Sequence, residues 1–266
     1  MHWRSINNNN NIEICIEFMI HVAQLTDTHL FASPDGELYG INTRDSLQAV
    51  IEHARINLPA LDMMLVTGDL VHDETLHGYQ ALRELVDQLE VPAYYLPGNH
   101  DDSALMQEVF PNVTRNGITS ADNGRWSVVL LDSSIQGKVE GELTADKLAR
   151  LEESLRANDN KYVLIALHHH VVDVQSQWID SLKLRNNAEF LELLAKFPNV
   201  KVVLNGHIHQ ELDQQSHCIR FLGSPSTCFQ FKPHQNNASI DNVPAGYRHL
   251  VLHDDGSVET KVYYLD

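Results

Sequence analysis

Five polar clusters along the chain carry side chains that could bind metal ions or move protons. Each follows a short apolar run that predicts a β-strand, and each is rich in histidine, aspartate or asparagine. Imidazole, carboxylate and amide groups are ligands of divalent first-row metals, so the clusters together predict a metal site. The five clusters are Asp27-Thr28-His29, Gly68-Asp69, Gly98-Asn99-His100-Asp101, His168-His169-His170 and Gly206-His207-Ile208-His209.

The spacing within the clusters favours the same chemistry. Asp27 and His29 lie two residues apart, so in an extended chain both side chains leave the backbone on the same face. His207 and His209 repeat this spacing, and a carboxylate at Asp69 could bridge two ions through its two oxygens. Three clusters begin with a glycine where a sharp turn and a close backbone approach would be needed, namely Gly68, Gly98 and Gly206.

Each pattern alone has an ordinary explanation. An Asp-x-His occurs often by chance, a Gly-Asp after a strand is usually a turn, and a His-x-His could be two surface residues. The Asn-His-Asp segment could cap a following helix through Asp101 or Asp102. Five such clusters after five predicted strands are improbable by chance, so we interpret them as one site.

Alternating strands and helices would position these clusters. Helical periodicity predicts helices over 43–57, 75–89, 144–157 and 187–196. Apolar runs predict strands over 20–25, 62–67, 93–96, 127–131, 162–167 and 200–204, with closing antiparallel strands over 219–222, 247–253 and 258–264. The order favours a parallel sheet, and ligands bind at the carboxyl ends of such strands.

The composition restricts the partners. The chain has 266 residues and a formal charge of −17, with 36 acidic against 19 basic side chains. An acidic surface repels a nucleic-acid backbone, so we expect no long nucleic acid as partner. No apolar run approaches the roughly 18 residues of a membrane span, so we expect no membrane partner. The chain has three cysteines, Cys15, Cys218 and Cys228. This odd number predicts inert thiols in a reducing compartment, and hence a cytoplasmic location.

The amino-terminal segment differs from the rest of the chain. The asparagine run 7–11 is polar and of low complexity, and such a run cannot pack into a core. We expect 1–19 to be a disordered extension, or a segment upstream of a true start of translation at Met19. Residues 20–266 contain no fixed-period repeat and no linker, so they are expected to form one domain.

The order of the five clusters resembles the signature of the calcineurin-like metallophosphoesterases and spans 27–209. Further stretches are similar to the bacterial class III 3′,5′-cyclic AMP phosphodiesterases of this superfamily, namely 25–31, 96–101, 207–213 and 225–233. The resemblance implies the family's α/β fold, a four-layer α/β/β/α sandwich with two mixed β-sheets flanked by helices.

The resemblance also implies roles for the matching residues. Two divalent metal ions, typically iron and manganese, would be held by Asp27, His29 and His209 and by Asn99, His168 and His207, with Asp69 between them. The implied reaction is hydrolysis of cyclic AMP to 5′-AMP by a hydroxide between the ions. His100 and Asp69 would be catalytic, with Asp101 orienting the His100 ring. The implied substrate contacts are His29, Asp69, Asn99, His100, His168 and His209.

Two details stay open at this stage. The triple histidine leaves a choice of ligand, and we interpret His168 as the ligand, His169 as its support and His170 as exposed. The loop 171–185 could form a wall of the nucleotide pocket through Trp178, or Trp178 could pack in a hydrophobic satellite. A second wall is expected from Ser226, Thr227 and Phe229.

Other functions are compatible with the same fold. The alternatives are another phosphodiesterase or phosphatase of the superfamily, a nuclease for short polymers, or a non-catalytic scaffold. Scaffolds of this fold usually lose ligands, whereas all seven ligand positions are filled here. The expected partner is the small substrate cyclic AMP, and a homodimer is compatible with the sequence.

Overall fold

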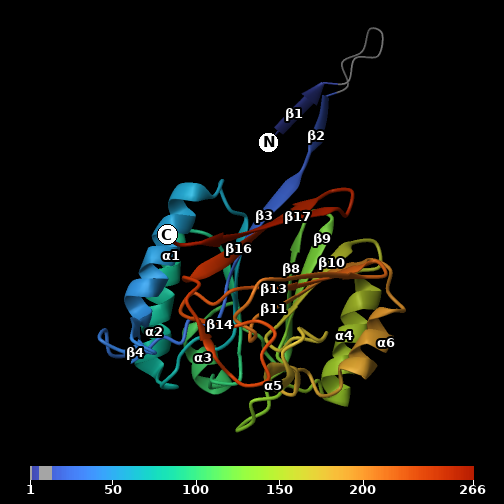
Figure 1. Ribbon diagram of the computed structural model, residues 1–266. Helices are drawn as coiled ribbons and strands as arrows, with labels where there is room; N and C mark the ends of the chain where they lie inside the picture. Colours follow the sequence, from blue (N-terminus) through green and yellow to red (C-terminus); the bar gives the residue numbers. More distant parts are fainter. Residues whose placement is uncertain (1, 6–13) are drawn as a thin grey trace.

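Two β-sheets lie face to face in the computed structural model, which describes residues 2–5 and 14–266 and their side chains from residue 18 onward (Figure 1). The five-stranded sheet has the order β17 (Val258–Tyr264), β16 (Gly246–His253), β3 (Met19–Leu25), β6 (Met63–Thr67) and β7 (Ala93–Leu96). The six-stranded sheet has the order β12 (Leu212–Ser216), β13 (Ile219–Gly223), β11 (Val200–Asn205), β10 (Tyr162–Leu167), β9 (Trp126–Leu131) and β8 (Ile118–Asn123).

Both sheets are mixed. In the first, β3, β6 and β7 run parallel, whereas β16 and β17 are antiparallel additions. In the second, β9, β10, β11 and β13 run parallel, and β8 and β12 are antiparallel edges. The short pairs outside these sheets are β1 (His2–Ser5) with β2 (Ile14–Glu17), β4 (Glu37–Leu38) with β5 (Ile41–Asn42), and β14 (Gln230–Phe231) with β15 (Ile240–Asp241).

Helices cover the outer face of each sheet, so the molecule has four layers (Figure 1). The five-stranded sheet is covered by α1 (Thr43–Asn57), α2 (Leu76–Val86) with the 3-10 turn η1 (Asp87–Leu89), and α3 (Ser103–Val109). The six-stranded sheet is covered by α4 (Ala145–Ala157) and α6 (Asn187–Leu194), and α5 (Gln177–Asp180) lies in the loop before α6. The expected four-layer α/β/β/α sandwich is confirmed.

The period-2 alternation of each central strand explains these layers. Val22 and Leu65 point between the two sheets, whereas Ala23 and Val66 point toward the helices. Successive side chains of a strand leave opposite faces, so a strand buried on both faces must be apolar throughout. Apolar runs such as Met63–Thr67, buried at every position, are the result.

Capping side chains begin the helices where the sequence predicts them. Thr75 Oγ1 accepts a hydrogen bond from Gly78 N (3.1 Å), and Thr144 Oγ1 accepts one from Lys147 N (3.3 Å). Of the two candidate caps after Asn99, Asp102 caps α3 by accepting from Ala104 N and Leu105 N.

Several expectations need correction or stay open. Strand 219–222 was expected to be antiparallel, but β13 is antiparallel only to β12 and parallel to β11. The polar strands β8 and β12 were not predicted, because partly exposed edge strands lack a long apolar run. The asparagine run 7–11 lies outside the described residues, so the extension proposed for 1–19 stays a prediction.

Two further expectations concern the cysteine thiols and membrane-spanning helices. Cys218 is exposed and Cys228 is buried, and both are free thiols. Burial raises the pKa of the Cys228 thiol to about 12, so this side chain stays protonated at neutral pH. No helix in the described part of the chain is long and apolar enough to cross a membrane.

Candidate metal centre

The loops after the parallel strands bring the predicted ligands together. Five of the seven have φ angles in the left-handed region, namely Asp27 (54°), His29 (44°), Asp69 (50°), His207 (66°) and His209 (47°). This conformation costs a non-glycine residue on the order of 1–3 kcal/mol and persists only where surrounding contacts fix it. Backbone hydrogen bonds provide such contacts, since Asp27 N donates to Gly68 O (3.0 Å) and His29 N donates to Asp69 O (2.9 Å). Strain concentrated in this way is typical of a functional site.

Glycines in three clusters let the loops approach the ligands, as the sequence predicts. A Cβ atom on Gly98 would lie 2.2 Å from Asp69 Oδ1, and one on Gly206 would lie 2.7 Å from Asp27 Oδ2. A Cβ atom on Gly68 would lie 2.4 Å from His168 Nδ1. These separations leave no room for any side chain, so each glycine is required by packing.

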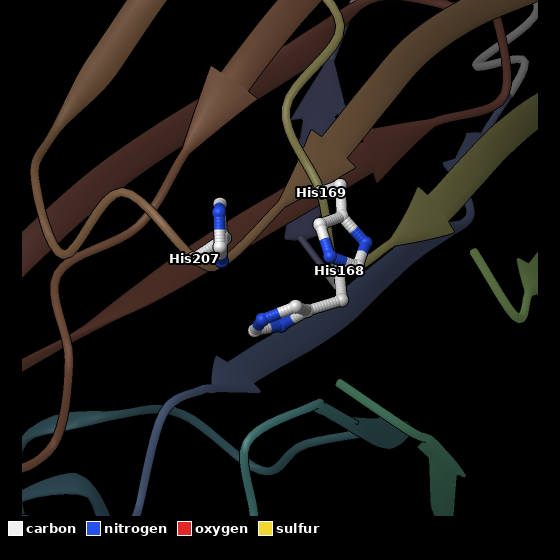
Figure 2. A group of neighbouring side chains, drawn as sticks. All are labelled: His168, His169 and His207. Carbon is white, nitrogen blue, oxygen red and sulfur yellow. The ribbon is translucent and has the colours of Figure 1, made fainter. Parts of the chain in front are cut away.

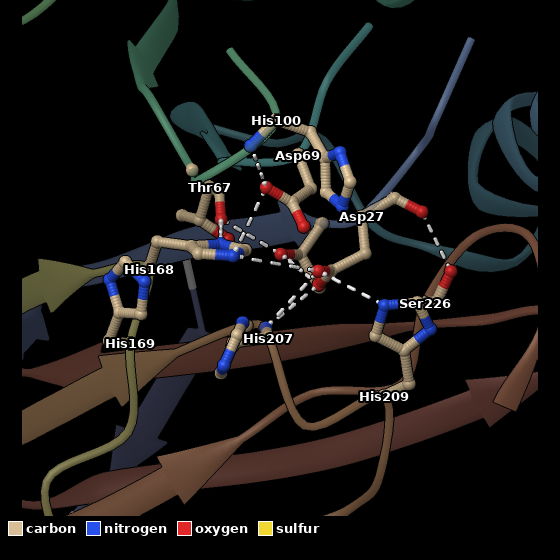
Figure 3. Close-up of polar contacts among 12 residues, drawn as sticks. Asp27, Thr67, Asp69, His100, His168, His169, His207, His209 and Ser226 are labelled. Atoms are coloured by element: carbon tan, nitrogen blue, oxygen red, sulfur yellow. Dashed lines mark hydrogen bonds and ion pairs between the residues drawn. The ribbon is translucent and has the colours of Figure 1, made fainter. Parts of the chain in front are cut away.

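Two buried carboxylates form the middle of the cluster (Figure 3). Asp69 Oδ1 lies 3.3 Å from His168 Nε2, and Asp69 Oδ2 lies 4.0 Å from His29 Nε2. Asp27 Oδ1 lies 3.2 Å from His209 Nε2, and the backbone N–H of His207 donates to Asp27. The two oxygens of Asp69 thus face different imidazoles, which is the arrangement expected of a carboxylate between two cations.

Backbone carbonyl groups orient two of the imidazoles. His168 Nδ1 lies 3.0 Å from Thr67 O, and His209 Nδ1 lies 2.7 Å from Phe229 O. A carbonyl accepts the proton of Nδ1, so Nε2 is the ring nitrogen that faces the carboxylates. An imidazole held in this way can bind a metal ion through Nε2 once that atom carries no proton.

The triple histidine separates into three environments. His168, His169 and His207 have ring nitrogens within 4.8 Å of one another (Figure 2). Both ring nitrogens of His169 have partners, Ser133 Oγ at 2.8 Å and Val139 O at 2.9 Å. His168 Nε2 has no hydrogen-bond partner among the described residues. These contacts favour His168 over His169 as the ligand.

His170 is not exposed, contrary to the expectation from sequence. Its side chain is fully buried, and Nε2 lies 3.4 Å from Asp180 Oδ1. Asp180 ends α5 and also accepts hydrogen bonds from Val174 N and Ser176 N. The contact therefore ties the loop after β10 to the helix that carries Trp178.

Unpaired buried atoms test whether a metal centre fits here. Among the described residues, Asn99 Oδ1, His168 Nε2 and His207 Nε2 are buried without a hydrogen-bond partner. Buried polar atoms are normally satisfied, so three such atoms without a hydrogen bond in one cluster call for a ligand. A second group, Asp27, His29 and His209, has its ligand atoms within 4.8 Å of one another. The donor set fits divalent cations.

The charges of the cluster also suit a cation. Burial disfavours the charged form of Asp69, but His168 and His29 outweigh burial and hold its pKa well below the usual range. Asp27 has a lowered pKa for the same reason, through His209 and His168. Burial lowers the pKa of His29 to about 3, whereas Asp69 outweighs burial and raises the pKa of His168 to about 9. A cation at Asp69 therefore has to displace the proton of His168.

A cavity of about 220 Å³ opens onto this cluster. Its walls are largely aromatic, and they include Tyr39, Trp178, Phe229 and Phe231. Trp178 lines the cavity and also packs against the apolar cluster around Val174, Ile179 and Ile208, so its packing is confirmed and its contact with a nucleotide stays a prediction. The expected wall from Ser226 and Thr227 is wrong, because both are fully buried and Ser226 Oγ donates to Asp27 O (2.7 Å).

His100 lies where its implied role requires, whereas Asp101 has a different task from the one implied. His100 lines the cavity, and its ring centroid lies 5.4 Å from that of His29. The backbone N–H of His100 donates a hydrogen bond to Asp69 Oδ1 (2.9 Å). The Asp101 carboxylate accepts hydrogen bonds from the backbone N–H groups of Gly98, Leu70 and Val71. Asp101 thus supports two loops of the site, and the expectation that it orients the His100 ring is wrong.

Comparison with known proteins agrees with this geometry. Residues 20–211 match the family described as calcineurin-like phosphoesterase. The chain belongs to this family. The phosphoesterase is 40% identical over 253 residues to a 3′,5′-cyclic adenosine monophosphate phosphodiesterase CpdA of Escherichia coli, covering 94% of this chain and 91% of that protein. It is also 40% identical over 243 residues to a 3′,5′-cyclic-nucleotide phosphodiesterase of Nostoc sp., covering 91% of each.

A solved structure supports the fold. The phosphoesterase superposes on a dimetal phosphatase from Danio rerio with a TM-score of 0.66 and 15% identity, covering 93% of this chain and 99% of that chain. At this identity the likeness concerns the fold alone. The family match and the similar phosphodiesterases identify the chain as a hydrolase, and the solved structure supports its fold.

Sequence reasoning missed two parts of the site in this phosphoesterase. His72 lines the cavity, and its ring lies 5.2 Å from that of His100. Tyr39 reaches the cavity from the turn between β4 and β5 and contacts Phe229 edge-on at 4.8 Å. His72 follows Asp69 by three residues, and its place after a predicted strand was the available signal. The sequence around Tyr39 did not indicate a site residue, because its turn is placed by contacts with residues far away along the chain, such as Phe229.

Proposed function

We propose that this phosphoesterase hydrolyses 3′,5′-cyclic AMP to 5′-AMP with two divalent metal ions. The observation that carries the proposal is a cluster of seven candidate metal ligands, five of which line an aromatic cavity, in a chain 40% identical to a protein named as a cyclic AMP phosphodiesterase. The buried carboxylates and imidazoles suit the phosphodiester, and the aromatic walls suit a purine base.

Seven side chains of the cluster would hold the ions. Asp27, His29 and His209 would bind one, Asn99, His168 and His207 the other, and Asp69 both. When bound, the two cations supply an activated water as nucleophile and neutralise charge on the phosphoryl oxygens. The mixed set of imidazoles, carboxylates and an amide suits divalent first-row metals, and we propose iron and manganese, the pair that the family resemblance implies.

His100 is the proposed acid of the reaction. Attack by water forms a new P–O bond and breaks the bond between phosphorus and the 3′ oxygen, and that oxygen leaves needing a proton. The His100 ring lines the cavity beside His29, and the hydrogen bond from His100 N to Asp69 fixes the loop that carries it. Its imidazole is thus placed to donate that proton.

Side chains of the metal centre and of the cavity walls would hold the two parts of the nucleotide. His29, Asp69, Asn99, His100, His168 and His209 are the proposed contacts of the phosphate. Trp178 and Phe229 would contact adenine through their rings, and the buried Nε1–H of Trp178 has no partner among the described residues. The site of action is proposed to be the cytoplasm, in line with the free thiols of Cys218 and Cys228.

Product analysis tests the proposed function. Manganese-loaded protein incubated with cyclic AMP is expected to yield 5′-AMP, and protein stripped with a chelator is expected to yield none until manganese is returned. Separation of the nucleotides by chromatography measures both results. Cleavage of bis(p-nitrophenyl) phosphate without cleavage of cyclic AMP would keep the metal centre and refute the substrate. Failure on both substrates would favour a scaffold.

A His100→Ala variant tests the proposed acid. The rate on cyclic AMP is expected to fall about 10²–10⁴-fold, because the 3′ alkoxide leaves poorly without a proton. The rate on bis(p-nitrophenyl) phosphate should fall much less, because p-nitrophenolate is a good leaving group. Initial rates on the two substrates give this ratio. An equal loss on both would mean that His100 acts on the site as a whole and not on the leaving oxygen.

A Trp178→Ala variant tests the proposed base contact. Loss of a ring that stacks on a base costs about 1–3 kcal/mol, so the KM for cyclic AMP should rise roughly tenfold while kcat changes little. Trp178→Phe keeps an aromatic face and is the matched comparison. A lower Tm with an unchanged KM would leave Trp178 as a packing residue of the apolar cluster.

A further inference from the structure

His29 differs from the other oriented imidazoles in the partner of its second nitrogen. His168 and His209 face backbone carbonyl oxygens through Nδ1, at 3.0 and 2.7 Å. The Nδ1 atom of His29 faces a side chain, the Nδ1 atom of His72, at 3.4 Å. A carbonyl is always an acceptor, whereas an imidazole nitrogen accepts only when it carries no proton.

The backbone holds this pair of histidines side by side. Leu30 N donates to Leu70 O (2.9 Å), and His72 N donates to Leu30 O (2.8 Å). The loops after β3 and β6 therefore continue the parallel pairing of their strands beyond the sheet, with a further bridge between Leu30 and Val71. The approach of the two rings thus follows from main-chain pairing.

Contacts on the other faces of His72 hold its ring in place. Its centroid lies 5.0 Å from the Phe31 ring and 5.2 Å from the His100 ring, with the His100 planes inclined by 27°. The half-buried side chain is therefore held between two rings while its Nδ1 edge faces His29. A ring held in this way offers its lone pair in a fixed direction.

We propose that His72 is a positioning residue of the metal centre, which accepts the Nδ1 proton of His29 and keeps Nε2 of His29 free to bind metal. His29 Nε2 points to the cluster, 3.4 Å from His209 Nε2, so its proton has to reside on Nδ1 when a cation binds. His72 must then carry its own proton on Nε2. The inference rests on the proposed metal centre and is independent of the proposed substrate.

Manganese titration of three metal-free variants tests the inference. His72→Phe keeps a ring against Phe31 and His100 but removes the acceptor, so it should bind one of the two ions about 10–100-fold more weakly. His72→Asn returns an acceptor oxygen and should recover most of that affinity. His77→Ala, an exposed histidine of α2, should match the wild-type protein. Isothermal titration calorimetry measures the affinities, and circular dichroism checks the fold of each variant.

Two results of the titration would overturn the inference. The first is wild-type affinity for both ions in His72→Phe, and the second is an equal loss in His72→Phe and His72→Asn, which would make the ring shape decisive. A second readout is the long-range ¹H–¹⁵N spectrum of the zinc-loaded protein, where His72 should be the Nε2–H tautomer and an Nδ1–H tautomer would contradict the inference. If the wild-type protein binds two ions but leaves cyclic AMP intact, the substrate proposal fails and this inference stands.

Discussion

Replacing Asp69 with asparagine is expected to lower phosphodiester hydrolysis by at least about 10³-fold and to reduce bound manganese from about two ions per chain to about one. The two oxygens of Asp69 face His168 and His29, which belong to different ions in the proposed centre. An amide offers one oxygen and no charge, so it cannot serve both cations. Elemental analysis of the purified protein and initial rates on bis(p-nitrophenyl) phosphate measure the two effects.

Asp35→Asn is the matched control for this variant, because Asp35 is exposed in the turn before β4. It should retain two ions and the full rate. Circular dichroism should be unchanged in Asp69→Asn, because the amide oxygen can still accept from His100 N. An Asp69→Asn protein with both ions and activity within about tenfold of wild type would show that Asp69 does not bridge them.

The central strands were predictable from the sequence because they are apolar on both faces, whereas the four layers were implied by the resemblance to the family. Val22 and Ala23 serve two different cores, and a run of this kind has few alternatives to a buried strand. Strand partners were less predictable. The residues of β13 do not encode whether a parallel or an antiparallel neighbour will pair with them, so its parallel pairing with β11 went unforeseen.

The chemical types at the metal centre were predictable for a different reason. Each polar cluster ends a strand, and parallel strands bring their carboxyl ends to one edge. The details that failed depend on contacts distant in the chain. His170 contacts Asp180, which α5 brings to it, and the Asp101 carboxylate accepts hydrogen bonds from backbone N–H groups of its own loop and of the loop after β6.

The left-handed backbone conformation of five ligands could not be predicted from the sequence either. Aspartate and histidine tolerate a positive φ better than most residues, but nothing in a local pattern requires it. His29 and His72 illustrate the consequence, since their approach follows from pairing between two loops that lie about forty residues apart along the chain. Spacing within one cluster can suggest a ligand, whereas the partner of that ligand depends on the folded loops.

Gly206→Ala is expected to disrupt the centre through packing alone, without removing any ligand. The new Cβ atom would lie 2.1 Å from Thr26 Oγ1, 2.7 Å from Asp27 Oδ2 and 3.1 Å from Thr67 O. None of these atoms can yield easily, because Thr26 Oγ1 lies within hydrogen-bond distance of both Asp27 Oδ2 (2.7 Å) and Thr67 O (2.9 Å). The free energy of unfolding should fall by about 3 kcal/mol, and the ion held by Asp27 should be lost.

Urea unfolding of the metal-free protein and manganese titration separate these two effects. Gly124→Ala is the control, because a Cβ atom there meets nothing within 4 Å while its φ of 56° carries the ordinary strain of a left-handed alanine. That variant should lose only about 1–2 kcal/mol of stability and keep both ions. Equal behaviour of Gly206→Ala and Gly124→Ala in both measurements would contradict this prediction. The Asp27 carboxylate would then be held in place by the hydrogen bonds from His207 N and not by the close approach of the loop at Gly206.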